Sequence, residues 1–294
     1  MTRQRLRRSV LYMPGANTRA LAKAATIDCD ALIFDLEDAV APASKKVARD
    51  NVVEALGGTD YGHRELIVRV NGLDTPWGAD DVAAVAHLPL DAVLFPKIDD
   101  AGMVRKAQAS IEAAFEQTGD SGELPALWAM IESPKSIIEL PQICTASSAL
   151  QVLVMGTSDL VRDLSASHQA NREPLIYALS ATVNAARAYG LGVLDGVHLD
   201  FSNAETFLAT CEQGSALGFD GRTLIHPSQV DVANTVFGFS AEDIEHASRV
   251  LEAWQQAEAA GRGVVELDGQ LIENLHADDA RALLALAEAL QRRA

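Results

Sequence analysis

The chain has 294 residues, of which 48 % are hydrophobic and 5 % aromatic, and its formal net charge is −17 at pH 7. This length can bury a large core, and the negative charge argues against non-specific binding to nucleic acid or to an anionic membrane. No apolar run is long enough to cross a bilayer, and the basic opening segment MTRQRLRR lacks the apolar stretch of a secretory signal. We therefore expect a cytoplasmic protein with a short basic arm.

The cysteine content also favours a cytoplasmic, reducing compartment. They are three in number, lie far apart in apolar contexts, and show no spacing typical of metal ligands: Cys29, Cys144 and Cys211. An odd, scattered set predicts buried free thiols in a reducing environment.

Short apolar runs rich in β-formers alternate with helical patterns along most of the chain. The runs cover residues 10–14, 31–37, 66–71, 92–98, 126–132, 150–156, 191–196 and 219–227. Helix entry signals stand between them at Asn17, Pro174 and Ser202. Eight strands with intervening helices predict an α/β fold, a (β/α)₈ TIM barrel. An open doubly wound sheet is the alternative, but it would normally carry a glycine-rich phosphate motif after its first strand, where YMPGAN has one glycine.

The composition changes after the eighth strand. Residues 240–294 are rich in Ala, Glu and Leu, and Asp268-Gly269 is a hairpin turn signal between two helical patterns. We expect residues 1–238 to form the barrel and residues 239–294 to form a C-terminal helical lid or arm. A purely structural helical cover fits the same periodicity.

Polar residues stand where the predicted strands end. They are Glu37, Asp38, Arg69, Asn71, Lys97, Glu132, Asp159, Asp195 and His226. In a TIM barrel the carboxyl ends of the strands carry the active site, so these side chains are expected to gather on one rim.

Glu132 and Asp159 follow consecutive strands and are expected to point at one spot. Two neighbouring carboxylates repel, so either one stays protonated or a cation sits between them. Oxygen ligands with open positions suit Mg²⁺. Each acid could instead cap a helix or form a salt bridge.

Arg69 is a single cation in an apolar strand and needs an anion. Its partner is either Glu37 or Asp38, or else a substrate carboxylate or enolate, which the guanidinium fits well. Asp35 and Glu37 share a face by alternation and could orient metal-bound water or pair with a basic neighbour.

The remaining basic candidates have weaker signals. Lys97 could form a Schiff base, but a structural or electrostatic role is favoured, because the acidic pair offers a metal alternative. Arg19 and Lys23 lie on one helix face and, with Arg8, could form a patch for phosphates, or be solvated surface cations. His226 before a proline could simply cap a loop.

Taken together, these stretches resemble the citrate lyase beta subunit and malyl-CoA lyase family of acyl-CoA lyases, within the HpcH/HpaI aldolase superfamily. The matching pieces run in order along nearly the whole chain: RSVLYMPGAN, DLEDAVAP, RVNGLDTPWG, FPKI, IESP, MGTSDL, LDGV and GFDGRTLIHPSQ. The resemblance implies a TIM barrel that assembles as a homotrimer or homohexamer and uses Mg²⁺ to cleave or form a carbon–carbon bond next to a CoA thioester.

The resemblance also implies roles for individual residues. Glu132 and Asp159 would bind Mg²⁺, and Arg69 would contact the substrate. The CoA site would be lined by Tyr12, Arg19, Lys23, Ile225 and His226. Glu273 matches a C-terminal acid, commonly Asp in the family, that an adjacent subunit supplies for proton transfer.

The expected function is therefore an acyl-CoA lyase that converts a 3-hydroxyacyl-CoA, such as malyl-, citramalyl- or citryl-CoA, into acetyl-CoA and a 2-oxo acid. Two alternatives stay open. The protein could be a malyl-CoA thioesterase with the same barrel and metal, or a non-catalytic subunit that binds CoA or a carrier protein within a larger lyase.

Overall fold

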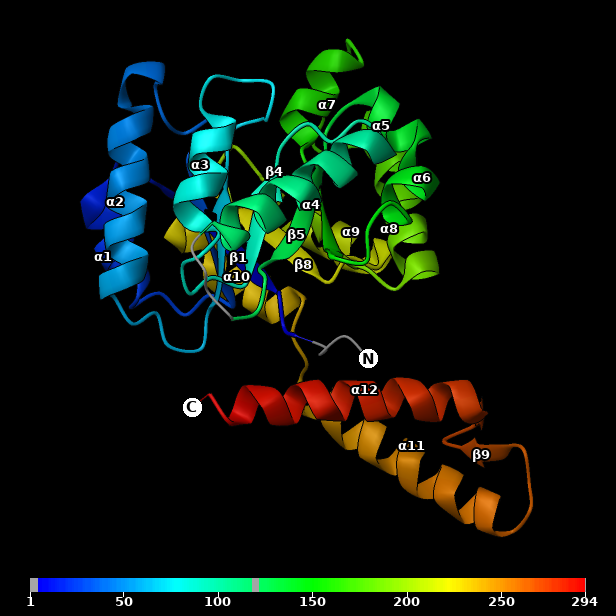
Figure 1. The fold of residues 1–294 in the computed structure, drawn as a ribbon. Helices are drawn as coiled ribbons and strands as arrows, with labels where there is room; N and C mark the ends of the chain where they lie inside the picture. Colours follow the sequence, from blue (N-terminus) through cyan, green and yellow to red (C-terminus); the bar gives the residue numbers. More distant parts are fainter. Residues whose placement is uncertain (1–4, 118–121, 294) are drawn as a thin grey trace. The chain divides into compact units, whose positions relative to one another are not determined.

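The computed structural model describes residues 5–117 and 122–293, and its central feature is a closed barrel of eight parallel strands. Each strand pairs with the next in chain order, and β8 closes on β1 (Figure 1). The strands are β1 (Ser9–Pro14), β2 (Ala31–Asp35), β3 (Glu65–Arg69), β4 (Ala92–Phe95), β5 (Ala126–Ile131), β6 (Leu150–Met155), β7 (Gly192–Asp195) and β8 (Gly221–Leu224). The predicted TIM barrel is confirmed.

Helices surround the strands and cover the apolar outer face of the sheet (Figure 1). They are α1 (Thr18–Ala24), α2 (Lys45–Gly58), α3 (Gly78–Val85), α4 (Ala101–Glu116), α5 (Pro134–Ile138), α6 (Leu140–Cys144), α7 (Thr157–Asp163), α8 (Ile176–Tyr189), α9 (Ala204–Leu217) and α10 (Val230–Val236). Three short 3₁₀ turns complete the connections: η1 (Pro42–Ser44), η2 (Glu173–Leu175) and η3 (Pro227–Gln229).

The predicted helix entry signals are mostly confirmed. Asn17 caps α1 by accepting the N–H of Ala20 at 3.1 Å, and Pro174 lies in η2, which leads into α8. The prediction for α9 was wrong by one residue: Asn203, not Ser202, accepts the N–H of Thr206. Both residues are good caps, and the Ser202 hydroxyl instead binds Asp200 at 2.6 Å.

The strands are shorter than the apolar runs suggested, chiefly at their carboxyl ends. The run 31–37 yields a strand that ends at Asp35, and the run 126–132 yields one that ends at Ile131. The terminal carboxylates therefore stand just beyond the sheet, where the chain is free to turn them toward the barrel axis.

Two apolar layers hold the barrel together. The inner layer fills the barrel around Trp128, with contributions from alternate residues such as Ile33, Ile67 and Leu94. The outer layer lies between strands and helices and contains all three cysteines, which are buried free thiols as predicted. Strand alternation thus divides the side chains between the interior and the helices.

The amino ends of the strands are closed by two ion pairs. Arg7 contacts Glu65 at 2.6 Å and lies over the Trp128 ring, and Arg8 contacts Asp30 at 2.8 Å. Arg8 therefore does not join Arg19 and Lys23 in a phosphate patch, because it is buried against Asp30 before the start of β1. Arg3, which opens the predicted basic arm, lies outside the described residues.

The chain divides between Phe237 and Gly238 into the barrel and a smaller unit of residues 238–293 with Arg5 and Leu6. The smaller unit consists of α11 (Ala241–Ala259), the hairpin β9 (Val265–Leu267) and β10 (Gln270–Ile272), and α12 (Asn274–Gln291). Its own apolar cluster centres on Val250, Trp254 and Ile272. The role of this unit as a lid stays a prediction.

The turn signal in the smaller unit is confirmed. Asp268 and Gly269 connect β9 to β10 with φ angles of 52° and 80°. Two consecutive positive φ angles are typical of the tight hairpin turn that an Asp-Gly pair favours. Among the described residues, no helix has the length and apolar character that crossing a lipid bilayer requires.

Candidate active site

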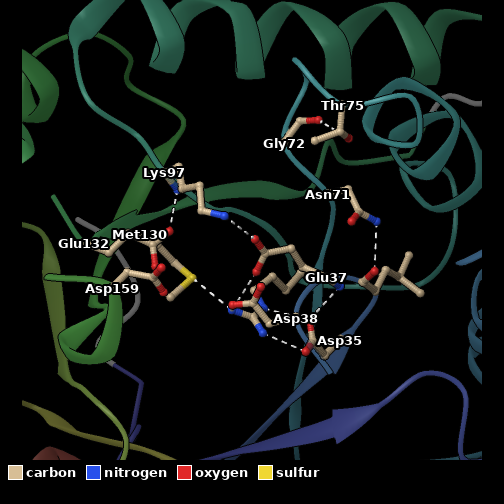
Figure 2. A network of polar contacts seen from close by, with 12 residues as sticks. Asp35, Glu37, Asp38, Asn71, Gly72, Thr75, Lys97, Met130, Glu132 and Asp159 are labelled. Atoms are coloured by element: carbon tan, nitrogen blue, oxygen red, sulfur yellow. Dashed lines mark hydrogen bonds and ion pairs between the residues drawn. The ribbon is translucent and has the colours of Figure 1, made fainter. Parts of the chain in front are cut away.

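The carboxyl ends of β2, β3, β5 and β6 bring one network of charged side chains together (Figure 2). Asp35 and Arg69 occupy partner positions on β2 and β3. Ile131 and Met155 are partners on β5 and β6, so Glu132 and Gly156 follow them side by side. The register of the parallel strands therefore delivers these side chains to one rim, as the sequence predicted.

Arg69 is the most heavily contacted cation of the network. Its Nε and Nη2 each donate to Asp35 at 2.7 Å, and Nη1 lies 3.0 Å from Glu37 and 3.5 Å from the Met130 sulfur. The guanidinium also stacks on the Tyr12 ring, with its Cζ 4.8 Å from the ring centroid. The side chain is thus clamped on three sides.

The main partner of Arg69 differs from the expected one. The sequence suggested Glu37 or Asp38, whereas Asp35 holds Arg69 in a bidentate pair and Asp38 lies 3.8 Å away at an exposed position. Burial opposes ionisation of Asp35, but the charge and hydrogen bonds of Arg69 outweigh it and lower the pKa of Asp35. The observed role of Asp35 and Glu37 is therefore to pair with basic neighbours.

Glu132 is buried at 3 % exposure and is held by the backbone of the adjacent strand end. Its Oε1 accepts the N–H of Lys97 at 2.6 Å. Burial first, and then the negative charges of Glu37 and Asp159, raise the pKa of Glu132 to about 7. The metal-free protein therefore carries a carboxylate here that is costly to ionise.

Lys97 makes this contact with a strained backbone, because its φ of 54° lies in the left-handed region. For a residue with a side chain this costs about 1 kcal/mol or more. Its amine lies 3.2 Å from Glu37, and although burial lowers the pKa of Lys97, the charge of Glu37 raises it further. A Schiff-base lysine needs a lowered pKa, so the geometry favours the electrostatic role.

Gly156 makes room for Glu132. A Cβ placed on Gly156 would collide with the Cβ and the carboxylate of Glu132. In the sequence, the only signal of this requirement is the glycine between an apolar strand and the TSDL segment. The glycine lets the two strand ends approach closely, and its N–H donates to Ile131 O at 3.0 Å.

Asp159 lies in the first turn of α7, on the same side of the network as Glu132 (Figure 2). It is partly exposed, at 18 %, and pairs with Arg162 at 2.7 Å. The two acids are close enough for the charge of Asp159 to raise the pKa of Glu132. One buried and one partly exposed carboxylate thus lie near each other on this side of the network.

This donor set fits Mg²⁺. Among the described residues, no group of three or more His, Cys, Asp or Glu side chains is arranged to enclose a metal ion. Mg²⁺ does not need such a cage, because it commonly takes one or two carboxylates and completes its shell with water and substrate oxygens. A cation between Glu132 and Asp159 would also counter the burial and the nearby negative charges that raise the pKa of Glu132.

The remaining predicted residues lie on β1, α1 and the segment after β8. Tyr12 packs against Arg69 inside the barrel, while Arg19 and Lys23 are exposed on α1. Ile225 is 38 % exposed, and His226 stacks on Phe201 with ring centroids 4.9 Å apart. Their part in binding CoA stays a prediction.

His226 does cap the following turn, as one sequence interpretation proposed. Its Nδ1 accepts the N–H of Ser228 at 3.2 Å. Asp195, by contrast, does not reach the rim: its carboxylate is fully buried against Arg172 at 2.6 Å. The prediction that Asp195 lies on the rim is therefore wrong.

Glu273 lies in the smaller unit, at the N-terminal boundary of α12. Its backbone N–H donates to His276 Nδ1 at 3.0 Å, and its side chain is partly exposed. The carboxylate is flanked in sequence by Leu271 and Leu275, which are 59 % and 55 % exposed. Its role in proton transfer stays a prediction.

Comparison with known proteins identifies the family to which this chain belongs. The family model described as HpcH/HpaI aldolase/citrate lyase matches residues 8–227. A (3S)-malyl-CoA thioesterase of Cereibacter sphaeroides is 45 % identical over 283 residues, covering 96 % of this chain and 95 % of the relative. Citrate lyase subunit beta of Escherichia coli strain K12 is 37 % identical, covering 97 % and 94 %.

Solved structures also match this chain along most of its length. The protein CitE from Mycobacterium tuberculosis, in complex with magnesium, acetoacetate and coenzyme A, superposes with a TM-score of 0.77. It is 28 % identical, and the match covers 95 % of this chain and 97 % of that one. A complex of the citrate lyase beta subunit from the same organism with oxaloacetate and magnesium has a TM-score of 0.65 at 28 % identity, covering 78 % of this chain and 96 % of that one.

Proposed function

Because this chain belongs to the HpcH/HpaI aldolase/citrate lyase family, we propose that it is a Mg²⁺-dependent acyl-CoA lyase. It cleaves or forms the carbon–carbon bond of a 3-hydroxyacyl-CoA, giving acetyl-CoA and a 2-oxo acid. Malyl-CoA is the preferred candidate substrate, because relatives that are 45 % identical bear the name (3S)-malyl-CoA thioesterase. For malyl-CoA, the 2-oxo acid product is glyoxylate.

One observation carries the proposal: Glu132 and Asp159 lie on the same side of the network (Figure 2), and the charges of Asp159 and of the clamped Arg69 both act on buried Glu132. Mg²⁺ held by Glu132 and Asp159 would polarise the hydroxyl and carboxylate oxygens of the substrate. Related structures that contain magnesium together with acetoacetate or oxaloacetate support this choice of metal and ligand.

In this proposal, Arg69 stabilises the enolate of acetyl-CoA that forms during cleavage. When the bond breaks, the hydroxyl gives its proton to the ionised carboxylate of Glu273, its carbon becomes a carbonyl, and the bonding electron pair moves toward the thioester carbonyl oxygen. A fixed cation aimed at that oxygen lowers the barrier because it needs no reorganisation. The bidentate contact with Asp35 and the stacking on Tyr12 hold Arg69 in one orientation.

The enolate carbon must then receive a proton, and Glu273 is our candidate donor. Glu273 lies in the smaller unit, so we propose that it reaches the barrel of a neighbouring copy in a homotrimer or homohexamer. The exposed Leu271 and Leu275 on either side of it support burial against another surface. CoA would lie over Arg19, Lys23, Ile225 and His226.

Hydrolysis of malyl-CoA is the second candidate function, favoured by the name of the 45 % identical relatives. Attack of water on the thioester carbonyl would develop negative charge on the same oxygen, so Arg69 would serve both reactions. A non-catalytic subunit that binds CoA or a carrier protein is a third possibility, motivated by the match to citrate lyase subunit beta. The complete set of Glu132, Asp159 and Arg69 argues against it.

One assay separates these functions. Purified protein is incubated with Mg²⁺ and malyl-, citramalyl- or citryl-CoA, and the products are separated by liquid chromatography. A lyase releases acetyl-CoA and the 2-oxo acid, a thioesterase releases free CoA and the hydroxy acid, and a non-catalytic subunit binds CoA without turnover. Absence of acetyl-CoA with all three substrates would refute the lyase assignment.

The free, buried cysteines are consistent with a reducing compartment. We therefore keep a cytoplasmic location as a prediction.

A further inference from the structure

A second group of buried charges lies on the outer side of the barrel wall, between β7, β8 and the helices. Leu194 belongs to the inner apolar layer, so the next residue, Asp195, faces outward. Ser9 pairs with Arg222 in the register of β1 and β8, whereas its neighbour Val10 faces the interior. Arg222 therefore also faces the helices and is separated from the acidic pair by the strands.

The charges of this group do not balance. Asp195 is fully buried, and Arg172 donates to its two oxygens at 2.8 and 2.6 Å. Arg172 also donates to Gln213 at 2.7 Å, and its φ of 54° shows a left-handed backbone at this position. Arg222 shares the same carboxylate at 3.4 Å. Two buried guanidinium groups and one carboxylate leave one positive charge in excess.

Arg222 bears this excess. It is 1 % exposed, and its Nε and Nη1 have no hydrogen-bond partner among the residues that the structure describes. Its Cζ lies 5.7 Å from the centroid of the Phe207 ring, which offers only a weak interaction. Burying a cation without a full counter-charge is unfavourable by several kcal/mol. An anion beside Arg222 would therefore stabilise this side chain.

A cavity of about 370 Å³ lies against this group. Its lining includes Arg172, Arg222, His198, Thr157, Pro174 and Leu175, and thus combines charged, polar and apolar walls. This size is at the lower end of small-molecule sites. Asp200 also lines the cavity, but at an exposed position where Ser202 holds its carboxylate at 2.6 Å.

We propose that this cavity binds a small organic oxyanion, a carboxylate or a phosphate ester. The anionic group would supply the missing charge beside Arg222, and the apolar part of the ligand would pack on Pro174 and Leu175. Thr157 begins α7, the helix that carries Asp159, so the cavity borders the candidate active site. The proposal does not depend on the function proposed above.

Titration calorimetry of the full-length protein with sodium pyruvate and with sodium phosphate tests this site. Buffers contain EDTA and no Mg²⁺, at constant ionic strength, so that the acidic pair cannot hold a metal-bound ligand. We expect saturable one-site binding of at least one of the two anions. Saturation by pyruvate alone identifies a carboxylate site, and saturation by phosphate alone identifies a phosphate site.

Two variants localise the binding. Arg222→Met removes the excess cation, and Ala170→Trp fills the cavity from an exposed lining position without changing any charge. Each should weaken binding by roughly tenfold or more, as loss of a charged hydrogen bond predicts. Arg187→Met, the same substitution at an arginine on α8 that pairs with Asp220, is the matched control and should bind as the wild type does.

Thermal unfolding separates a ligand site from a purely structural arginine. Arg222→Met leaves Arg172 and Asp195 as a balanced pair, so in anion-free buffer its melting temperature should equal or exceed that of the wild type. The wild type should gain stability when the anion is added, and Arg222→Met should not. The proposal is overturned if neither anion saturates the wild type, or if both variants bind with unchanged affinity.

Discussion

Arg69 and Asp35 occupy partner positions on adjacent strands and are joined by two hydrogen bonds of 2.7 Å. The pair is almost fully buried, and Glu37 and the Tyr12 ring close the remaining sides of the guanidinium. The orientation of the cation at the rim is therefore set by a carboxylate that makes no contact with the acidic pair. This relationship leads to the first prediction.

Asp35→Asn should impair catalysis by releasing Arg69 from its orientation. Breaking a buried ion pair costs about 3 kcal/mol or more, part of which Glu37 offsets by staying near Arg69. We expect kcat to fall about tenfold or more while the KM for the acyl-CoA changes little. Steady-state kinetics and urea unfolding measure the two effects. Asp38→Asn is the control, because Asp38 is exposed and 3.8 Å from Arg69; equal losses in both variants would contradict the positioning role.

Glu132→Gln and Asp159→Asn should each abolish most Mg²⁺-dependent turnover. Both substitutions keep the shape of the side chain and remove the charge that a divalent cation requires. Calorimetric titration with Mg²⁺ and assays at rising Mg²⁺ concentrations check this directly. Asp163→Asn, on the same helix as Asp159 and also paired with Arg162, should behave as the wild type. Wild-type rates in both acidic variants would refute the metal assignment.

Gly156→Ala should weaken Mg²⁺ binding without changing any charge, because the added methyl group collides with the carboxylate of Glu132. We expect a loss of affinity of about tenfold, the size typical of a displaced ligand or its support. Gly57→Ala is the control: a Cβ at Gly57 meets no neighbouring atom within 4 Å, and this helical position should accept alanine. Unchanged Mg²⁺ affinity in Gly156→Ala would show that Glu132 is not the ligand.

The metal-free protein should lose stability as the pH rises from 5 to 8, and Glu132 should be a main cause. Its folded pKa is about 7, above the value of 4.5 for an unperturbed glutamate, so the folded state holds the proton more tightly. The resulting stabilisation is present below pH 4.5 and disappears as the pH passes 7, and it amounts to about 3 kcal/mol. Added Mg²⁺ should reverse the loss.

Chemical unfolding in EDTA across this range measures the effect. Glu132→Gln should show a shallower pH dependence than the wild type and should be the more stable of the two at pH 8. Parallel pH profiles for both proteins would mean that Glu132 ionises normally in the folded state.

Glu273 should act on the active site of a different copy. Glu132→Gln and Glu273→Gln should each be nearly inactive alone. When the two are co-expressed and assemble at random, about one quarter of the sites combine an intact Glu132 with an intact Glu273 from a neighbour. Recovery of about that share of activity supports a shared site, and no recovery places Glu273 elsewhere. Glu273→Asp, which keeps the acid, should retain substantial activity.

The sequence by itself determined the barrel and the composition of its rim. Short apolar runs rich in β-formers favour strands, and such runs spaced by helical patterns favour a parallel closed barrel. Because parallel strands all point the same way, residues at their carboxyl ends, such as Glu132 and Arg69, had to meet. No long-range information was needed for that conclusion.

Only the tertiary structure decided which side chains pair. Alternation predicted that Asp35 and Glu37 face one way, but the register of β2 and β3 made Asp35 the bidentate partner of Arg69. The same alternation turned Asp195 away from the rim and toward Arg172 and Arg222, beside a cavity that no local pattern predicts. A local pattern assigns a side chain to a face, whereas its partner depends on strand register and on helices that are distant in the chain.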